Sequence, residues 1–130
     1  MENKNLIKTS KRHQFEMENE SWKRSLEFIR QENALLKYRL SEIVDGNEDG
    51  ELLTVAEFFQ NEFISNDEQN SGLIKLIGQF SGELFESSAE DFLSQKMIQQ
   101  HEKLRNEIVE FEKNFLQTSL DFNKRMLGSV

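Results

Sequence analysis

The sequence predicts an all-α fold, an elongated antiparallel three-helix bundle built around a coiled-coil hairpin. The 130 residues include no proline, the strongest helix breaker, and 31% of them are charged. Apolar residues recur at alternating spacings of three and four in three stretches, which is typical of helices that pack side by side. Turn-forming residues interrupt this pattern twice. We therefore expect helices over about residues 13–45, 52–86 and 88–126.

The first helix is expected after a polar start. Residues 1–11 predict a flexible polar N-terminal segment, and residues 12–127 a single helical-bundle domain. From about residue 13 a heptad seam continues for four repeats, with Asn19 and Asn33 as its polar positions. Further apolar residues widen the face beside the seam, which favours a third helix over a two-stranded coil. The seam positions are Phe15, Asn19, Trp22, Leu26, Ile29, Asn33, Leu36, Leu40 and Ile43.

The second helix is expected to begin with Thr54 as its N-cap and Glu57 as the acid of a capping box. Gly78 and Gly82 interrupt it, and they either kink the helix or let a neighbouring helix approach closely. The seam positions are Ala56, Phe59, Phe63, Asn66, Asn70, Leu73, Ile77, Phe80 and Leu84.

The third helix is expected to begin at Ser87 or Ser88, because each serine has an acid three residues later. Gly128 lies past its end. The alternative is one continuous helix over residues 73–126. His101 lies on the seam, where it predicts a partly buried polar residue or a pH-sensitive one. The seam positions are Met97, His101, Leu104, Ile108, Phe111, Phe115, Thr118 and Phe122.

The three seams match when the chain is folded back on itself. Reversal midway between residues 49 and 50 brings Asn33 opposite Asn66, and we expect these two amides to hydrogen-bond in an otherwise apolar seam. The same reversal pairs Leu40 with Phe59, Leu36 with Phe63, and Leu26 with Leu73. A second reversal near residue 88 aligns Leu104 with Leu26 and Leu73, and Phe115 with Leu36 and Phe63.

Residues 45–51 separate the first two helices, and they allow two interpretations. The first is an ordinary turn, because Gly46 follows the first seam, where helices often end with a glycine in the left-handed conformation. The second is a calcium site that uses Asp45, Asn47 and Asp49 as the alternate oxygen ligands of an EF-hand-like loop.

The calcium interpretation fails at the position that decides affinity. The bidentate glutamate of such a loop would fall on Ala56, and Glu57 comes one residue late. On a helix this slip rotates the carboxylate by about 100° away from the ion. The sequence therefore favours an ordinary turn, and a calcium-responsive helical protein using residues 45–57 is the alternative.

The charges of the chain are unevenly distributed. The net charge is −8, and residues 40–74 hold nine acidic residues without a Lys or Arg. Residues 1–13 have a net charge of +3, from Lys4, Lys8, Lys11 and Arg12 against Glu2. The overall acidity disfavours nucleic acid and anionic membranes as partners. The acidic stretch indicates either solubility or an acidic docking face.

The sequence lacks the motifs of several classes of enzyme and metal site. The absence of cysteine excludes disulfides, thiol catalysis and thiolate metal sites. We find no catalytic serine elbow, phosphate-binding loop, dinucleotide fingerprint or Glu-x-x-His metal motif, so we expect neither enzyme activity nor a cofactor. No signal peptide or membrane-spanning run is evident, which predicts a cytoplasmic protein.

The chain is therefore expected to act by binding through its helix faces, either to another protein or to a second copy as a homodimer. The candidate contact residues are Trp22, Phe28, Tyr38 and Phe58, because they are large and apolar. The simpler interpretation is that these four side chains fill a wide core.

Residues 56–64, with the acids that follow them, resemble small helical coiled-coil proteins of Bacteroidetes-type bacteria. Residues 32–40 and 103–105 resemble the same group. This resemblance implies a helical coiled-coil protein and no particular activity, because that group is uncharacterised. It also explains residues 45–51 as the turn of a shared hairpin.

Overall fold

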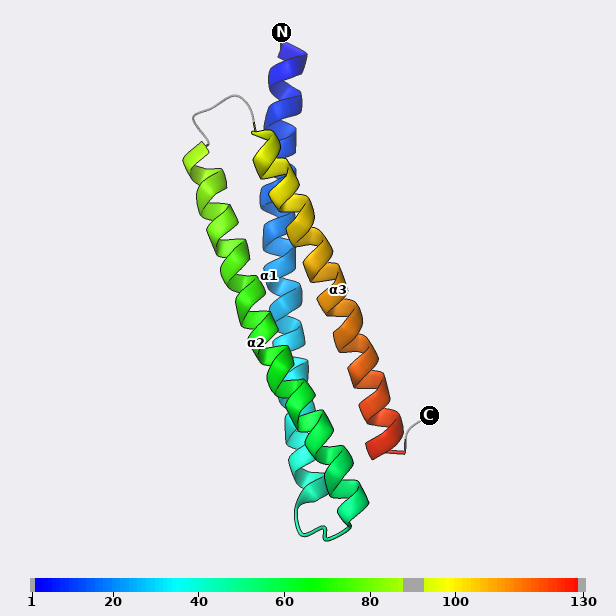
Figure 1. Ribbon diagram of the computed structural model, residues 1–130. Helices are drawn as coiled ribbons and strands as arrows, with labels where there is room; N and C mark the ends of the chain where they lie inside the picture. The colour runs from blue at the N-terminus through cyan, green and yellow to red at the C-terminus, as the bar shows by residue number, and fades with distance from the viewer. Residues whose placement is uncertain (1, 88–92, 129–130) are drawn as a thin grey trace.

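The computed structural model describes residues 2–87 and 93–128. It is a bundle of three long helices, α1 (Glu2–Val44), α2 (Gly50–Glu86) and α3 (Gln95–Met126). Figure 1 shows that α2 runs antiparallel to α1, and that α3 runs antiparallel to α2. The predicted all-α three-helix bundle is confirmed.

The predicted seams form one core along the bundle. All nine seam positions of α2, from Ala56 to Leu84, are buried. The seams of α1 and α3 are buried as well, apart from Trp22, Ile43 and Thr118, which are partly buried. The alternating spacing of three and four therefore identified the interior of the molecule.

The start of α1 differs from the prediction. The helix begins at Glu2 rather than at about residue 13, and its first turns extend beyond the other two helices (Figure 1). The prediction ended the helix where the apolar period ends. That period reports burial rather than helicity, and a polar, proline-free segment can continue a helix that packing holds further along.

The start of α2 is set by a different residue from the one predicted. Asp49 is the N-cap, and its carboxylate accepts hydrogen bonds from the backbone N–H groups of Glu51 and Leu52 at 3.0 and 3.4 Å. Thr54 lies one turn inside the helix, where its hydroxyl donates to the carbonyl of Gly50 at 2.9 Å. The predicted N-cap at Thr54 is therefore wrong, because Asp49 precedes it and accepts from the first free N–H groups of the helix.

The glycine pair of α2 marks neither a break nor a close helix contact. α2 continues from Gly50 to Glu86. Within residues 2–87 and 93–128, a Cβ atom added at Gly78 or Gly82 would have no neighbouring heavy atom within 4 Å. The expectation of a closely packed neighbour is wrong because both glycines lie off the seam, on the exposed side of the helix.

The connection between α2 and α3 is longer than predicted. Ser87 is the C-cap of α2 rather than the N-cap of α3, and Ser88 lies outside the described residues. The N-cap of α3 is Ser94, whose hydroxyl accepts a hydrogen bond from the N–H of Met97 at 3.1 Å. Because α2 ends before α3 begins, the alternative of one continuous helix over residues 73–126 is wrong.

The alignment of α1 with α2 is close to the prediction, but the predicted amide pair does not form. The Asn33 side chain donates to the carbonyl of Phe63 at 2.8 Å and to the carboxylate of Asp67 at 2.7 Å. Asn66 is buried at the same level, and its side-chain nitrogen has no hydrogen-bond partner among the residues that the structure describes. Phe63 and Asp67 thus take both N–H groups of the Asn33 amide, which leaves none to donate to Asn66.

The position of α3 along the bundle differs by roughly one to two turns from the prediction. Phe63 packs against Phe122, with ring centroids 5.3 Å apart, rather than against Phe115. On α1, the hydroxyl of Ser25 donates to the carboxylate of Glu112. The difference follows from the longer connection, because α3 begins at Gln95 rather than at about residue 88.

Candidate functional site

The connection between α1 and α2 is a hydrogen-bonded turn. Gly46 has a φ of 70°, in the left-handed conformation predicted for it. The side-chain oxygen of Asn47 accepts a hydrogen bond from the N–H of Asp49 at 2.9 Å, and the Asp49 carboxylate caps α2. Two of the three proposed calcium ligands in this turn, Asn47 and Asp49, therefore already bind backbone N–H groups, whereas Asp45 is an exposed side chain.

Glu57, the fourth calcium candidate, lies elsewhere. It lines a groove of about 460 Å³ between α1 and α2, together with Lys37 and Leu40 and with none of residues 45–51. Within the described residues, no group of three or more acidic or histidine side chains could hold a metal ion. The capping geometry supports the interpretation of residues 45–51 as an ordinary turn.

Three of the four proposed contact residues are exposed. Phe28 and Tyr38 of α1 have exposed fractions of 62% and 61%, and Phe58 of α2 has 48%. The ring of Phe58 packs edge-on against Phe59 at a centroid distance of 5.3 Å. Trp22 is different, because it is partly buried and packs against the core.

Trp22 belongs to an aromatic box around His101, which has no exposed surface. The imidazole stacks on Phe15 at a centroid distance of 3.8 Å and on Trp22 at 4.7 Å. Phe80 of α2 closes a further side at 4.9 Å. The side chain of one α3 residue is thus held by rings from both other helices.

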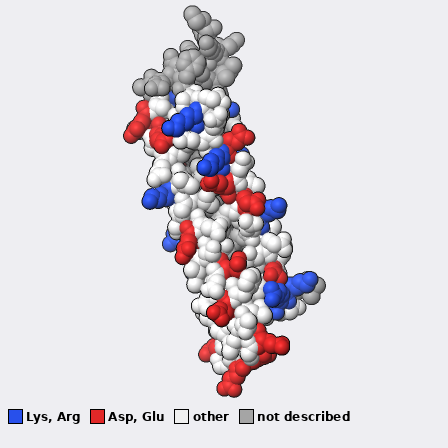
Figure 2. Space-filling model, in the orientation of Figure 1, with Lys and Arg blue, Asp and Glu red and all other residues white. Residues whose placement is uncertain are grey.

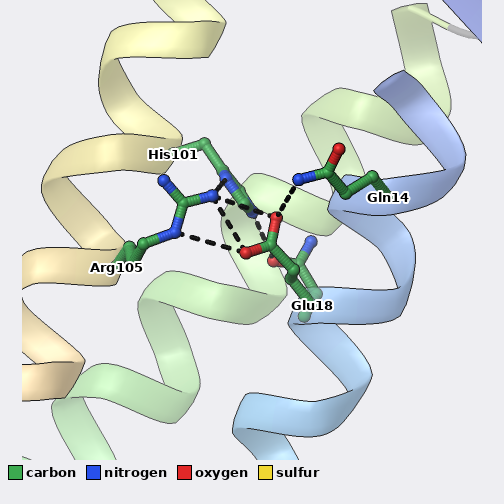
Figure 3. Close-up of polar contacts among 5 residues, drawn as sticks. Gln14, Glu18, His101 and Arg105 are labelled. Carbon is green, nitrogen blue, oxygen red and sulfur yellow. Dashed lines mark hydrogen bonds and ion pairs between the residues drawn. The ribbon is translucent and has the colours of Figure 1, made fainter. Parts of the chain in front are cut away.

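A chain of polar contacts joins the same three helices. The Nε2 atom of His101 lies 3.3 Å from the Oδ1 atom of Asn19, and the Asn19 amide donates to the hydroxyl of Ser81 at 3.2 Å. A guanidinium nitrogen of Arg105 lies 3.5 Å from Nδ1 of His101 (Figure 3). Because arginine only donates, Nδ1 accepts, and Nε2 carries the proton that it donates to Asn19.

These surroundings keep His101 neutral. Burial lowers its pKa from 6.5 to about 4, and the nearby Glu18 carboxylate opposes that change. Arg105 and Lys11 lower the pKa further through their positive charge. Arg105 binds Glu18 through hydrogen bonds of 2.9 to 3.2 Å, so the two charges largely offset each other beside the ring (Figure 3). His101 is fully buried, so its imidazole has no surface exposed to solvent.

A groove between α2 and α3 was not predicted from the sequence. Its volume is about 1070 Å³, and its floor includes the seam residues Leu73 and Phe111 and the exposed Leu76. At Gly72 the wall stays open, because a Cβ atom there would meet no heavy atom within 4 Å. A smaller hollow of about 210 Å³ shares Leu76 and extends the groove along both helices.

The rim of this groove is polar and mostly acidic. Three glutamates on α3 stand against one lysine, and the other rim residues carry amides. The rim residues are Gln69, Gln99, Glu102, Lys103, Asn106, Glu107, Glu110 and Asn114. Gly72 and Leu76 could have indicated this groove in the sequence, because they lie four residues apart and therefore share a helix face outside the seam.

An apolar floor with a polar rim is suited to the apolar side chains of another helix. Within the described residues, no helix contains a stretch that is long and apolar enough to cross a bilayer. No protein-family model, no curated protein and no solved structure matches this chain.

Proposed function

We propose that the protein is a non-enzymatic interaction protein that binds an amphipathic helix of a partner protein along the α2–α3 groove. The observation that supports this proposal is the apolar floor of the groove, where Leu76 is 44% exposed beside Gly72 and Leu73. A helix laid over this floor would bury the exposed leucine and give the bundle a fourth helix.

The dimensions of the groove indicate the length of the partner helix. On α2 its lining residues extend from Gln69 to Glu83. At about 1.5 Å per residue this span is about 20 Å, which corresponds to roughly four turns of a bound helix.

The rim indicates the charge of the partner helix. Glu102, Glu107 and Glu110 surround a single lysine, Lys103, so a helix with basic residues beside its apolar face would complement the groove. Asp and Glu at those flanking positions would be repelled. A basic amphipathic helix is therefore the proposed ligand.

A defined peptide tests this proposal. The probe is a labelled helical peptide of about four turns, with leucines on one face and lysines on the other, and the control is the same composition in scrambled order. We expect the amphipathic peptide to raise its fluorescence anisotropy with the protein, and the scrambled peptide to bind more weakly.

Matched variants locate the binding site. Leu76→Glu places a charge on the groove floor and should abolish binding of the amphipathic peptide. Phe58→Glu alters an exposed apolar residue of the same helix outside the groove and should leave binding intact. Equal binding of the two peptides, or equal effects of the two variants, would contradict the proposed function.

A further inference from the structure

The outer side of α1 carries four large apolar side chains that the bundle leaves exposed, with Arg24 and Gln31 between them. Met17, Phe28, Leu35 and Tyr38 have exposed fractions of 59%, 62%, 41% and 61%. Successive members lie 11, 7 and 3 residues apart. At about 100° per residue these spacings place all four on one side of the helix, away from the buried seam. We call these four residues the outer α1 stripe. None of them lines the α2–α3 groove.

The stripe matches itself when a second copy is turned end for end. Met17 and Leu35 lie equally far from residue 26 along α1. A two-fold axis beside residue 26 would therefore place Met17 of each copy against Leu35 of the other. The same axis brings the two Phe28 side chains to within about one turn of each other.

The charges at the two ends of the bundle favour the same antiparallel arrangement. Residues 1–13 have a net charge of +3, whereas residues 40–51, which would lie level with them in such a pair, contain five acidic residues and no basic ones. Figure 2 shows acidic side chains gathered at the end of the molecule that carries the α1–α2 connection. An antiparallel pair sets the basic start of each α1 beside the acidic end of the other copy, and a parallel pair would bring like charges together.

We propose that the protein forms an antiparallel homodimer through the outer α1 stripe. Residues 11–44 of α1 extend over about 50 Å, so two such helices meet along a length suited to an interface of ordinary size. Each copy keeps its α2–α3 groove open, because that groove is lined by α2 and α3 alone. The dimer thus presents two grooves to partner helices.

Single cysteines test both the contact and its direction, since the chain has no cysteine of its own. Met17→Cys and Leu35→Cys are prepared separately, and then mixed in oxidised glutathione. We expect a disulfide between the two variants. Each variant alone should remain unlinked, because like positions of an antiparallel pair lie about 27 Å apart, far beyond the reach of a disulfide. Disulfides within each single variant would indicate a parallel pair and overturn the proposal.

Mass in solution gives the second readout. Light scattering should show twice the chain mass of 15.3 kDa for the native protein and the single mass for Phe28→Glu, with helicity unchanged by circular dichroism. Leu76→Glu on the groove floor should remain a dimer. A monomeric native protein, or a dimeric Phe28→Glu variant, would overturn the inference.

The two experiments separate this inference from the proposed function. Loss of peptide binding with an intact dimer would count against the groove alone. Peptide binding by a monomer would count against the outer α1 stripe alone.

Discussion

The imidazole of His101 lies nearly parallel to the ring of Phe15, with centroids 3.8 Å apart and planes inclined by 14°. The ring nitrogens are already engaged, one by Asn19 and the other by Arg105. A second proton would have to enter at Nδ1, which faces the positively charged guanidinium of Arg105 at 3.5 Å. The structure therefore accommodates the neutral ring and disfavours the charged one.

This preference predicts a loss of stability in acid. The pKa of His101 is about 4 in the folded protein and 6.5 in the unfolded chain, so the unfolded state binds the proton first as the pH falls. The free energy of unfolding should therefore decrease between pH 6.5 and pH 4, by on the order of 3 kcal/mol. Urea unfolding at a series of pH values measures this decrease in the free energy of unfolding. The His101→Phe variant should lack the decrease that is due to His101. The matched control is His13→Gln, because His13 is exposed. A His101→Phe profile identical to that of the native protein would contradict the assignment.

The neighbouring charges should shift the pKa of His101 in opposite directions. Arg105→Gln removes a positive charge and should raise the pKa, whereas Glu18→Gln removes a negative charge and should lower it. Titration of the His101 ring signals by NMR measures both shifts. Shifts of the same sign would mean that desolvation changes, rather than the charges, dominate in these variants.

The contact of Asn33 with Asp67 can be measured by a double-mutant cycle. Asp67 accepts hydrogen bonds from both Asn33 and Lys37. We expect Asn33→Ala and Asp67→Ala to be coupled by about 0.5 to 3 kcal/mol in the free energy of unfolding. The cycle of Asn33→Ala with Asn66→Ala should show a smaller coupling, because these two amides do not bond. A larger coupling for the second cycle would restore the amide pair predicted from the sequence.

Asp49 should stabilise the protein without calcium. Asp49→Ala removes the N-cap of α2 and should lower the free energy of unfolding by about 1 kcal/mol, while Asp49→Ser should retain most of it. Thermal melts with calcium and with magnesium should be alike, because Asn47 and Asp49 bind backbone N–H groups. The calcium-responsive alternative requires a calcium-specific rise in melting temperature that Asp49→Ser abolishes.

Alanine at the exposed glycines of α2 should stabilise the bundle. A Cβ atom at Gly78 or Gly82 meets no neighbour within 4 Å, so Gly→Ala should raise the free energy of unfolding by about 0.5 to 1 kcal/mol at each position. The two gains should add, since neither glycine packs against another helix. Chemical denaturation of the single and double variants measures this. A loss of stability at either position would indicate a close contact on that side of α2.

The buried residues could be predicted because one rule determines them. A helix packed in a long bundle buries residues at alternating spacings of three and four. Phe59 and Ile108 lie at such positions, so their burial could be predicted from the sequence. Helix ends were predicted less well. They depend on single N-cap residues such as Asp49 and Ser94. Nearby Thr54 and Ser87 are also of residue types that cap helices, so the sequence alone does not distinguish them.

The lateral arrangement was beyond the sequence for a different reason. The offset of α3 depends on the length of a connection, and the groove beside Leu76 depends on where two helices separate. Neither quantity is encoded in the period of one helix. The exposure of Phe28 and Tyr38, by contrast, agrees with the seam, because both lie off it, whereas Trp22 lies on it and is partly buried.

The buried amides also constrain how the length of this chain can change. Asn33 and Asn70 each donate to a backbone carbonyl on the opposite helix, and Asn19 binds Ser81. Sliding α2 along α1 by one heptad would separate all three from their acceptors, whereas a wholly apolar seam would tolerate the slip. An insertion between residues 19 and 33 must therefore be matched by an insertion of the same length between residues 63 and 81. Extensions beyond these contacts, as in the first turns of α1, escape that constraint.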